Sequence, residues 1–246
     1  MTPLIETMLK HRSIRKFTEE AVSPEHLDLI FKASQAAATS SFLQAYSIIS
    51  ISQGASRDKL MNYCGEQSYV GSAPVFLVFC ADLHRLHQMS QMHNQNFEEG
   101  WTESMIIGTV DAALAGQNAM IAAESLGLGG VYIGGIRNNI EAVTELLKLP
   151  EEVYPVFGLC IGHPDQDPDI KERLPQSVVV HHDVYTPIET HKQTLEAYDE
   201  RIRAYYTKRT KGKVTESWSE SVAEKFSQES RPQVGPFLKK QKIGIR

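Results

Sequence analysis

Cysteine is scarce in this chain, with three among its 246 residues. Cys64, Cys80 and Cys160 lie far apart, form no CxxC motif and are odd in number. These features exclude a disulfide framework and argue against a cysteine metal site. The three residues fall mostly in apolar runs of strand length, so we expect buried, reduced thiols.

The chain also lacks a long uncharged apolar run and an apolar N-terminal segment. No stretch reaches the ~18 uncharged apolar residues that a membrane span requires. The opening residues MTPLIETMLKHRS contain no apolar region of the signal-peptide type. We therefore expect a cytoplasmic protein that does not bind a membrane. Internal repeats and low-complexity tracts are missing too, and a composition of 41% hydrophobic and 22% charged residues is typical of an ordinary globular protein.

Positive charge is sparse in most of the chain. Residues 1–189 contain 12 Lys and Arg against 23 Asp and Glu, whereas residues 190–246 contain 13 against 7. A nucleic-acid-binding protein usually carries a broader basic stripe with interleaved aromatic residues, so we expect no nucleic-acid partner. A basic C-terminal segment on an acidic body suits a small polyanionic ligand better.

No side-chain constellation for nucleophilic or metal chemistry is visible. The nine histidines are scattered, and the closest pairs, His84/His87 and His181/His182, have no carboxylate or cysteine at a spacing typical of a metal site or a triad. We therefore expect no metal site and no catalytic side chain. An enzyme with this sequence would need a borrowed cofactor.

Strand and helix patterns alternate without the regular rhythm of a doubly wound sheet. Helices are predicted to begin at Thr2–Pro3 and Ser23–Pro24, which are N-cap and first-turn pairs. The predicted strands are 46–52, 73–82, 129–133 and 153–164, and a helix is predicted over 138–150. This pattern predicts an α+β fold with a mixed sheet. Residues 1–189 would form the core, and residues 190–246 would form a helical arm of the same domain.

One segment, 103–127, is a long predicted helix that is apolar almost all round and rich in Ala and Gly. Such a helix must be buried in the core or in a subunit interface. Asp111, Gln117 and Asn118 interrupt the apolar surface, which argues against a position in lipid. The segment is therefore predicted to be the central helix of the fold.

The segment HRSIRKF, residues 11–17, follows the first predicted helix and is strongly cationic. Arg12 and Arg15 carry fork-shaped donors suited to phosphate or carbonyl oxygens, and His11 and Ser13 add short-range donors. Ile14 and Phe17 are expected to anchor the loop, although a charge run is often only a solvated loop. A second cationic pair, Lys171 and Arg173, could close on the same anion if the two loops meet.

The glycine-rich segment LGLGGVYIGG, residues 126–135, does not fit a dinucleotide fingerprint. That motif lies after a strand and before a helix, whereas Gly127, Gly129 and Gly130 follow a helix and precede a strand. Gly134 and Gly135 instead end a strand just before the helix cap predicted at Asn138 and Asn139. Their backbone could approach a flat ligand closely, or they could only form a tight turn.

Taken together, these segments resemble the flavin-dependent nitroreductase family, and within it the NADPH-preferring branch of oxygen-insensitive nitroreductases and NADPH-flavin oxidoreductases. The resemblance covers nearly the whole chain. It is carried by IETMLKHRSIRKFT, SSFLQAYSII, VFCAD, NAMIAAESLGLGGVYIGGIRNNIEAVTELLKLP, FGLCIGHPDQDPDIKERLP, AYYTKR and ESRP. Several blocks in the right order are more specific than any single motif.

The resemblance implies an intertwined homodimer with non-covalent FMN in two sites at the dimer interface. The implied FMN-binding residues are His11, Arg12, Ser13, Arg15, Thr39, Ser40, Gln67, Tyr132, Ile133, Gly134, Gly135, Lys171 and Arg173. His11, Ser13 and Arg173 would contact the phosphate, and Arg15 would lie nearer the flavin ring, where positive charge stabilises its reduced form. Arg209 in AYYTKR would bind the 2′-phosphate of NADPH.

The implied activity is an NADPH-dependent, ping-pong, two-electron hydride transfer through FMN N5 to nitroaromatics, quinones and related electron-poor acceptors. No protein group would act as a catalytic residue in this scheme. Two alternatives stay open: a flavin reductase that supplies free reduced FMN, and a flavin-binding redox sensor that does not turn over. The sequence does not identify the physiological acceptor, because apolar walls over a flavin ring discriminate weakly.

Overall fold

The computed structural model describes residues 1–244 and 246, and its chain forms two compact units. The first unit comprises residues 1–168 and 231–246, and the second comprises residues 169–230. The expected boundary between residues 189 and 190 differs from this division in two ways. The chain leaves the first unit about twenty residues earlier, and its last sixteen residues return to it. They return because Phe237 and Ile243 are buried in the core of the first unit.

A four-stranded sheet forms the centre of the first unit. Its strands are β1 (Tyr46–Ser50), β2 (Val75–Asp82), β3 (Gly129–Ile133) and β4 (Val153–Gly162), in the order β1-β2-β4-β3. Each neighbouring pair is antiparallel, so the expectation of a mixed sheet was wrong for the described part of this chain. The order of strands and helices, from which a mixed sheet was expected, does not fix strand direction, and the continuous apolar run of β2, buried along its whole length, does not fix it either.

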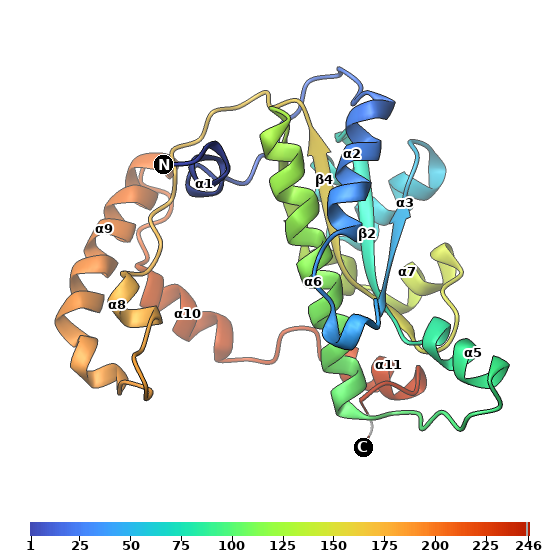
Figure 1. Cartoon of the computed structure of the whole chain (residues 1–246). Coiled ribbons are helices and arrows are strands. Elements are labelled where there is room, and N and C mark those ends of the chain that lie inside the picture. Colours follow the sequence, from blue (N-terminus) through green and yellow to red (C-terminus); the bar gives the residue numbers. More distant parts are fainter. Residues whose placement is uncertain (245) are drawn as a thin grey trace. The chain divides into compact units, whose positions relative to one another are not determined.

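Helices cover both faces of this sheet (Figure 1). The helical elements of the first unit are α1 (Pro3–Leu9), α2 (Pro24–Gln35), η1 (Ser40–Phe42), α3 (Ala55–Tyr63), α4 (Ser68–Ser72), α5 (His84–Met92), α6 (Thr102–Ser125), η2 (Gly134–Arg137), α7 (Ile140–Leu147) and α11 (Val234–Lys240). Two of the predicted caps are present: Ser23 accepts from the His26 amide, and Asn139 accepts from the Ala142 amide.

The two faces of the sheet bury two separate apolar clusters. Along β2, Leu77 and Phe79 point into the cluster that contains α2 and α6 residues, whereas Phe76 and Val78 point into the cluster that contains α3, α4 and α7 residues. This alternation follows from the period of two of a β-strand. The first unit is therefore a three-layer α+β structure, and the α+β prediction is confirmed.

Helix α6 is the predicted long central helix. One of its faces is buried against the sheet and α2, through small residues such as Ala112, Ala115 and Ala119. On its other face, Ile106, Val110 and Leu114 are exposed at a spacing of four residues. Among the described residues, α6 is the one helix long and apolar enough for a membrane span, but core helices of soluble proteins meet the same criterion.

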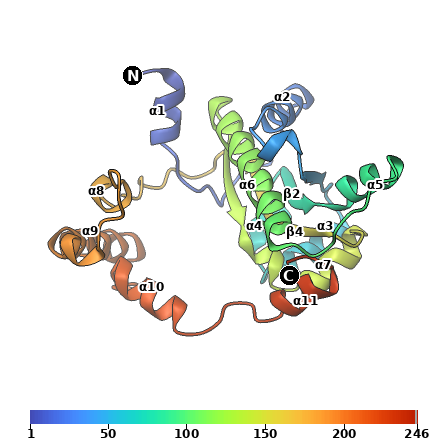
Figure 2. The ribbon, with the colours of Figure 1, turned by 60° about the horizontal axis from the view of Figure 1, so that its bottom comes forward.

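The second unit is built around one long, polar helix. Its helical elements are α8 (Gln176–Val179), η3 (Ile188–His191), α9 (Lys192–Thr210) and α10 (Trp218–Phe226). The helix α10 begins with a complete capping box between Ser217 and Glu220. Tyr198 and Ile202 are the buried residues of α9, and the ring of Tyr198 meets Trp218 edge to face. Figure 2 shows this unit and the first unit from a second direction.

Candidate functional site

The cationic loop 11–17 is anchored in the first unit beside β3. Ile14 is buried and its amide donates to the Gly130 carbonyl at 2.9 Å. A Cβ atom on Gly129 would lie 2.5 Å from the Ile14 side chain, so only glycine permits this approach. Phe17 forms an isolated bridge with Pro164. The expectation that Ile14 and Phe17 anchor the loop is confirmed.

The loop presents several hydrogen-bond donors that the first unit does not satisfy. The Nε atom of Arg12 is buried and has no partner among the described residues, although its guanidinium also pairs with Asp167. The described residues likewise provide no hydrogen-bond partner for the side chains of Ser13 and Arg15. Arg12 lines a cavity of about 240 Å³ together with Lys10 and Glu124. Such unpaired cationic donors suit an anionic ligand.

His11 is held differently from the rest of the loop. Its Nδ1 atom lies 2.6 Å from Oε1 of Glu124, near the C-terminal end of α6. The Glu124 side chain is largely buried, so this contact fixes the start of the loop against the helix. Glu124 had not been identified from the sequence, where nothing distinguishes it from a surface acid.

The glycine turn at the other end of β3 brings five predicted residues together. Gly135 is buried, and a Cβ atom there would lie 2.4 Å from the Cys64 carbonyl oxygen and 2.5 Å from Nε2 of Gln67. A Cβ atom on Gly134 would meet only Nη2 of Arg137, at 3.6 Å. The turn is therefore closely packed against the protein at Gly135 and open at Gly134. Tyr132 and Ile133 precede it on β3.

Tyr132 is fixed by two contacts on its own side of the sheet. Its ring meets Phe157 edge to face at 5.1 Å, and its hydroxyl donates to Oε1 of Gln117 at 3.3 Å. Burial raises the pKa of Tyr132 well above its ordinary value, so the hydroxyl is neutral at physiological pH. It can orient a neighbour by hydrogen bonding, but it does not supply a negative charge.

Thr39 and Ser40 lie beside a different part of α6 from the part that His11 contacts. The buried carboxylate of Asp111 accepts from the amides of Ser40 and Ala45, both at 2.9 Å, and so fixes the chain between α2 and β1. In the sequence, Asp111 only interrupts the apolar surface of a helix, and nothing there indicates the two amides that it accepts from. Because Asp111 and Glu124 are 13 residues apart on α6, the two loops attach to the helix about 20 Å from each other. Among the described residues, the two loops are therefore held at separate points of this helix.

Lys171, Arg173 and Arg209 gather in the second unit. Nζ of Lys171 donates to the Tyr206 hydroxyl at 2.5 Å, and Arg173 donates to the Lys171 carbonyl at 3.1 Å. Arg209 donates to the neighbouring Tyr205 hydroxyl at 3.2 Å. Lys171 and Arg209 therefore each contact one member of the Tyr205–Tyr206 pair on α9, and Arg173 contacts the main chain of Lys171. Their approach to the cationic loop stays a prediction.

Comparisons with known proteins identify the family of the chain. The model of the nitroreductase family matches residues 8–163, and that of its C-terminal domain matches residues 171–246. The chain is 46% identical over 241 residues to the oxygen-insensitive NADPH nitroreductase of Salmonella typhimurium, with 98% of each chain covered. It is 43% identical over 242 residues to the FMN reductase (NADPH) of Bacillus subtilis, with 97% of each covered.

A solved structure extends the likeness to three dimensions. The NADPH:FMN oxidoreductase of Vibrio harveyi, solved as a complex with NAD+, superimposes with a TM-score of 0.91 at 42% identity, and the match covers 100% of both chains. Sequence and structure therefore agree over both units, and this chain belongs to the nitroreductase family.

Proposed function

We propose that this protein is an NADPH-dependent FMN oxidoreductase that reduces nitroaromatics, quinones and related electron-poor acceptors by a ping-pong mechanism. The relatives' names support this activity, because they describe NADPH nitroreductases, NADPH-flavin oxidoreductases and FMN reductases. The single observation that carries the proposal is the set of unsatisfied donors and open backbone at the two ends of β3.

The residues present fit FMN by their chemistry. A phosphate with about two negative charges requires several cationic donors, and the loop 11–15 offers the buried, unpaired Nε of Arg12 beside Ser13 and Arg15. The open face of Gly134 leaves room for a flat group beside the main chain. When bound, FMN supplies the hydride acceptor and donor of the reaction.

The chain's own residues bind and orient the reactants. His11, Ser13 and Arg12 would hold the phosphate, joined by Lys171 and Arg173 of the second unit. Arg15 would place a fixed positive charge near the ring, and fixed charge of this kind stabilises an anionic reduced state. Gln67 and Tyr132 are themselves held by hydrogen bonds. They would limit the positions that the flavin can take beside the glycine turn.

Arg209 would select NADPH over NADH. It lies in the last turn of α9, next to Lys208 and close to Lys211, and stacks over the Tyr205 ring at 5.9 Å. A guanidinium held in this way is suited to the bidentate recognition of a phosphate. The 2′-phosphate is the group that distinguishes NADPH from NADH.

A homodimer would complete the site. Thr39 and Ser40 attach to α6 about 20 Å from the point where His11 does, so a second copy is the natural source of the missing contacts. The exposed stripe of Ile106, Val110 and Leu114 on α6 offers the apolar surface that such a dimer needs. We also propose a cytoplasmic location, which the free, buried cysteines support.

The flavin-reductase alternative is favoured by one observation, the match to an FMN reductase (NADPH). The two activities differ in what free FMN does. If the protein mainly supplies free reduced FMN, added FMN behaves as a saturable substrate above the rate given by the bound cofactor. If it mainly reduces nitroaromatics, free FMN adds little to their turnover.

Two matched pairs of variants test the proposed ligands. Arg15→Ala should weaken FMN binding about tenfold or more, whereas Lys16→Ala, its exposed neighbour, should have little effect. Arg209→Ala should raise the KM for NADPH much more than that for NADH, whereas Lys225→Ala on α10 should change neither. Unchanged FMN affinity in the first pair would contradict the site, and equal effects on both nucleotides would contradict the role of Arg209.

A further inference from the structure

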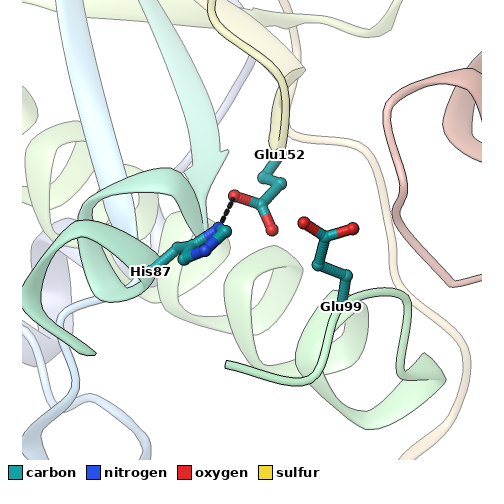
Figure 3. Close-up of side chains that lie close together, drawn as sticks. All are labelled: His87, Glu99 and Glu152. Carbon is teal, nitrogen blue, oxygen red and sulfur yellow. Dashed lines mark hydrogen bonds and ion pairs between the residues drawn. The ribbon is translucent and has the colours of Figure 1, made fainter. Parts of the chain in front are cut away.

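Three side chains from distant parts of the first unit converge away from the proposed flavin site (Figure 3). His87 lies on α5, Glu99 lies between α5 and α6, and Glu152 lies in the turn before β4. One ligand atom from each residue lies within 4.8 Å of the other two. We propose that these three residues bind a divalent transition-metal ion such as Zn²⁺ or Mn²⁺.

The spacing of the ligand atoms suits such an ion. Nδ1 of His87 and Oε2 of Glu152 are 2.8 Å apart. Two ligands that each lie about 2.1 Å from an ion are about 3 Å from each other at a right angle and about 3.4 Å at the tetrahedral angle, so the pair needs to open by only about 0.2 to 0.6 Å. Glu99 is partly exposed on a flexible side chain, so a small rotation brings its carboxylate to the same point.

The donor set also narrows the choice of ion. One imidazole and two carboxylates are common ligands of Zn²⁺ and related divalent metals. Ca²⁺ and Mg²⁺ prefer sites made of oxygen alone, and Cu(I) prefers thiolate or thioether sulfur. The cluster contains no sulfur and includes a nitrogen donor, so Zn²⁺ and Mn²⁺ are the ions to test.

The charges of the cluster call for a cation. The Glu152 side chain is only 5% exposed, and Oε1 of Glu152 has no hydrogen-bond or ion-pair partner among the described residues. Figure 3 shows the carboxylates of Glu152 and Glu99 facing each other. Lys242 lies 3.5 Å from Glu99 and 3.0 Å from Glu151, so its single charge is divided between these two carboxylates. A divalent ion between the two carboxylates would relieve their repulsion.

The surroundings of His87 provide the support that a ligating histidine needs. Its ring stacks on Phe97 at 4.6 Å with an interplanar angle of 9°, which fixes the ring plane. Its Nε2 atom lies 3.1 Å from the side-chain amide of Gln91. Ligation through Nδ1 places the proton on Nε2, and a half-turn of the Gln91 amide then offers an oxygen to accept it.

The site was not predicted from the sequence, in which no metal site was expected. His84 and His87 have no carboxylate at a ligand spacing near them, and Glu152 is 65 residues from His87. The ion would join α5, the following loop and the turn before β4. That turn is also tied to the C-terminal tail, because the Glu152 amide donates to the Gln241 carbonyl at 3.2 Å. A bound ion should therefore stabilise the first unit.

The test uses the full-length protein as purified, after treatment with a chelator and dialysis. Titration with Zn²⁺ and with Mn²⁺ by calorimetry should show one ion per chain, and saturating Zn²⁺ should raise the Tm. Glu152→Gln and His87→Ala should each weaken binding at least tenfold. Glu99→Gln, at a partly exposed position, should also weaken binding at least tenfold. This variant still tests the site if Glu152→Gln and His87→Ala do not fold. His93→Ala, an exposed histidine that follows α5, should bind as the parent does.

Two outcomes would overturn the proposal. The first is that neither ion binds or changes the Tm of the parent protein. The second is that the ions bind but the folded His87 and Glu99 variants retain the parent affinity, which would place the ion elsewhere. Neither outcome depends on flavin binding or on activity, so the proposal stands or falls separately from the proposed function.

Discussion

At the scale of single residues, Arg57 shows how a buried cation can be held without a carboxylate. It is fully buried and donates to the carbonyls of Val70, Ile51 and Ala73 at 2.5 to 2.6 Å. Its guanidinium also lies 5.0 Å from the centre of the Phe76 ring. Burial lowers the pKa of Arg57, but an arginine stays charged at physiological pH. The residue thus joins α3, α4 and the end of β1.

Replacing Arg57 should therefore destabilise the fold strongly. Arg57→Met leaves three buried carbonyls without donors, and we expect a loss of about 3 kcal/mol or more in the free energy of unfolding. Lys59→Met, at an exposed position on the same helix, should change it by less than about 0.5 kcal/mol. Urea unfolding followed by circular dichroism measures both. Equal stabilities of the two variants would show that the three carbonyls do not need Arg57.

The residue scale is also where sequence reasoning reached its limit. The cationic loop could be identified because its charges stand together in seven consecutive residues. The partners that hold the loops, Glu124 and Asp111, could not be, since each lies far along the chain from the group it fixes. The residues next to a buried acid on an apolar helix do not indicate which distant amide will donate a hydrogen bond to it. The cluster of His87, Glu99 and Glu152 could not be predicted for the same reason, because His87 and Glu152 are 65 residues apart in the sequence.

At the scale of elements, the two glycines of the turn after β3 have different surroundings. Gly135 faces the Cys64 carbonyl and Gln67, whereas Gly134 faces open space apart from Arg137. The two neighbours therefore have different reasons to be glycine. One makes room for the protein's own backbone, and we propose that the other makes room for the flavin.

This difference predicts opposite results for two alanine variants. Gly135→Ala would place a Cβ atom 2.4 Å from a backbone oxygen, so we expect a loss of about 2 kcal/mol or more in stability. Gly134→Ala should fold with nearly the parent Tm and should bind FMN at least tenfold more weakly. Thermal unfolding and a fluorescence titration with FMN measure the two effects. Parent-like FMN affinity in Gly134→Ala would remove this glycine from the proposed site.

Element types were largely predictable, because caps and periodicity are local signals. Ser23 and Asn139 cap the helices that they were expected to cap, and the long helix and the four strands lie within a few residues of their predicted ranges. Strand direction was not predictable. A strand buried on both faces, such as β2, has the same composition in a parallel and in an antiparallel sheet, so the sequence could not distinguish the expected mixed sheet from the antiparallel sheet of the described chain.

At the scale of the whole molecule, the division into units depends on where the chain returns. The charge contrast between residues 1–189 and 190–246 suggested an arm that extends to the C-terminus. The tail beyond residue 231 instead belongs to the first unit, since α11 buries Phe237 there. The distribution of charged residues along the sequence therefore marks where the surface becomes basic. The boundary between the two units is set instead by which apolar side chains are buried.

The proposed dimer predicts a change in molecular mass when α6 is altered. Val110→Glu places a charge in the middle of the exposed apolar stripe of this helix, and burying an unpaired charge in an interface is unfavourable. We expect the variant to be monomeric, or at least tenfold weaker in association, by light scattering coupled to gel filtration. Lys59→Glu, exposed on α3, is the control and should keep the parent mass. A monomeric parent protein, or a dimeric Val110→Glu variant, would rule out this interface.

The central claim is that this protein binds FMN and that NADPH reduces it. The most direct measurement mixes the FMN-loaded protein with one equivalent of NADPH without oxygen and follows the visible flavin absorbance. We predict that the absorbance is lost within the mixing experiment and returns when a nitroaromatic or a quinone is added. A protein that stays colourless after incubation with FMN, or a bound flavin that NADPH does not bleach, would contradict the account.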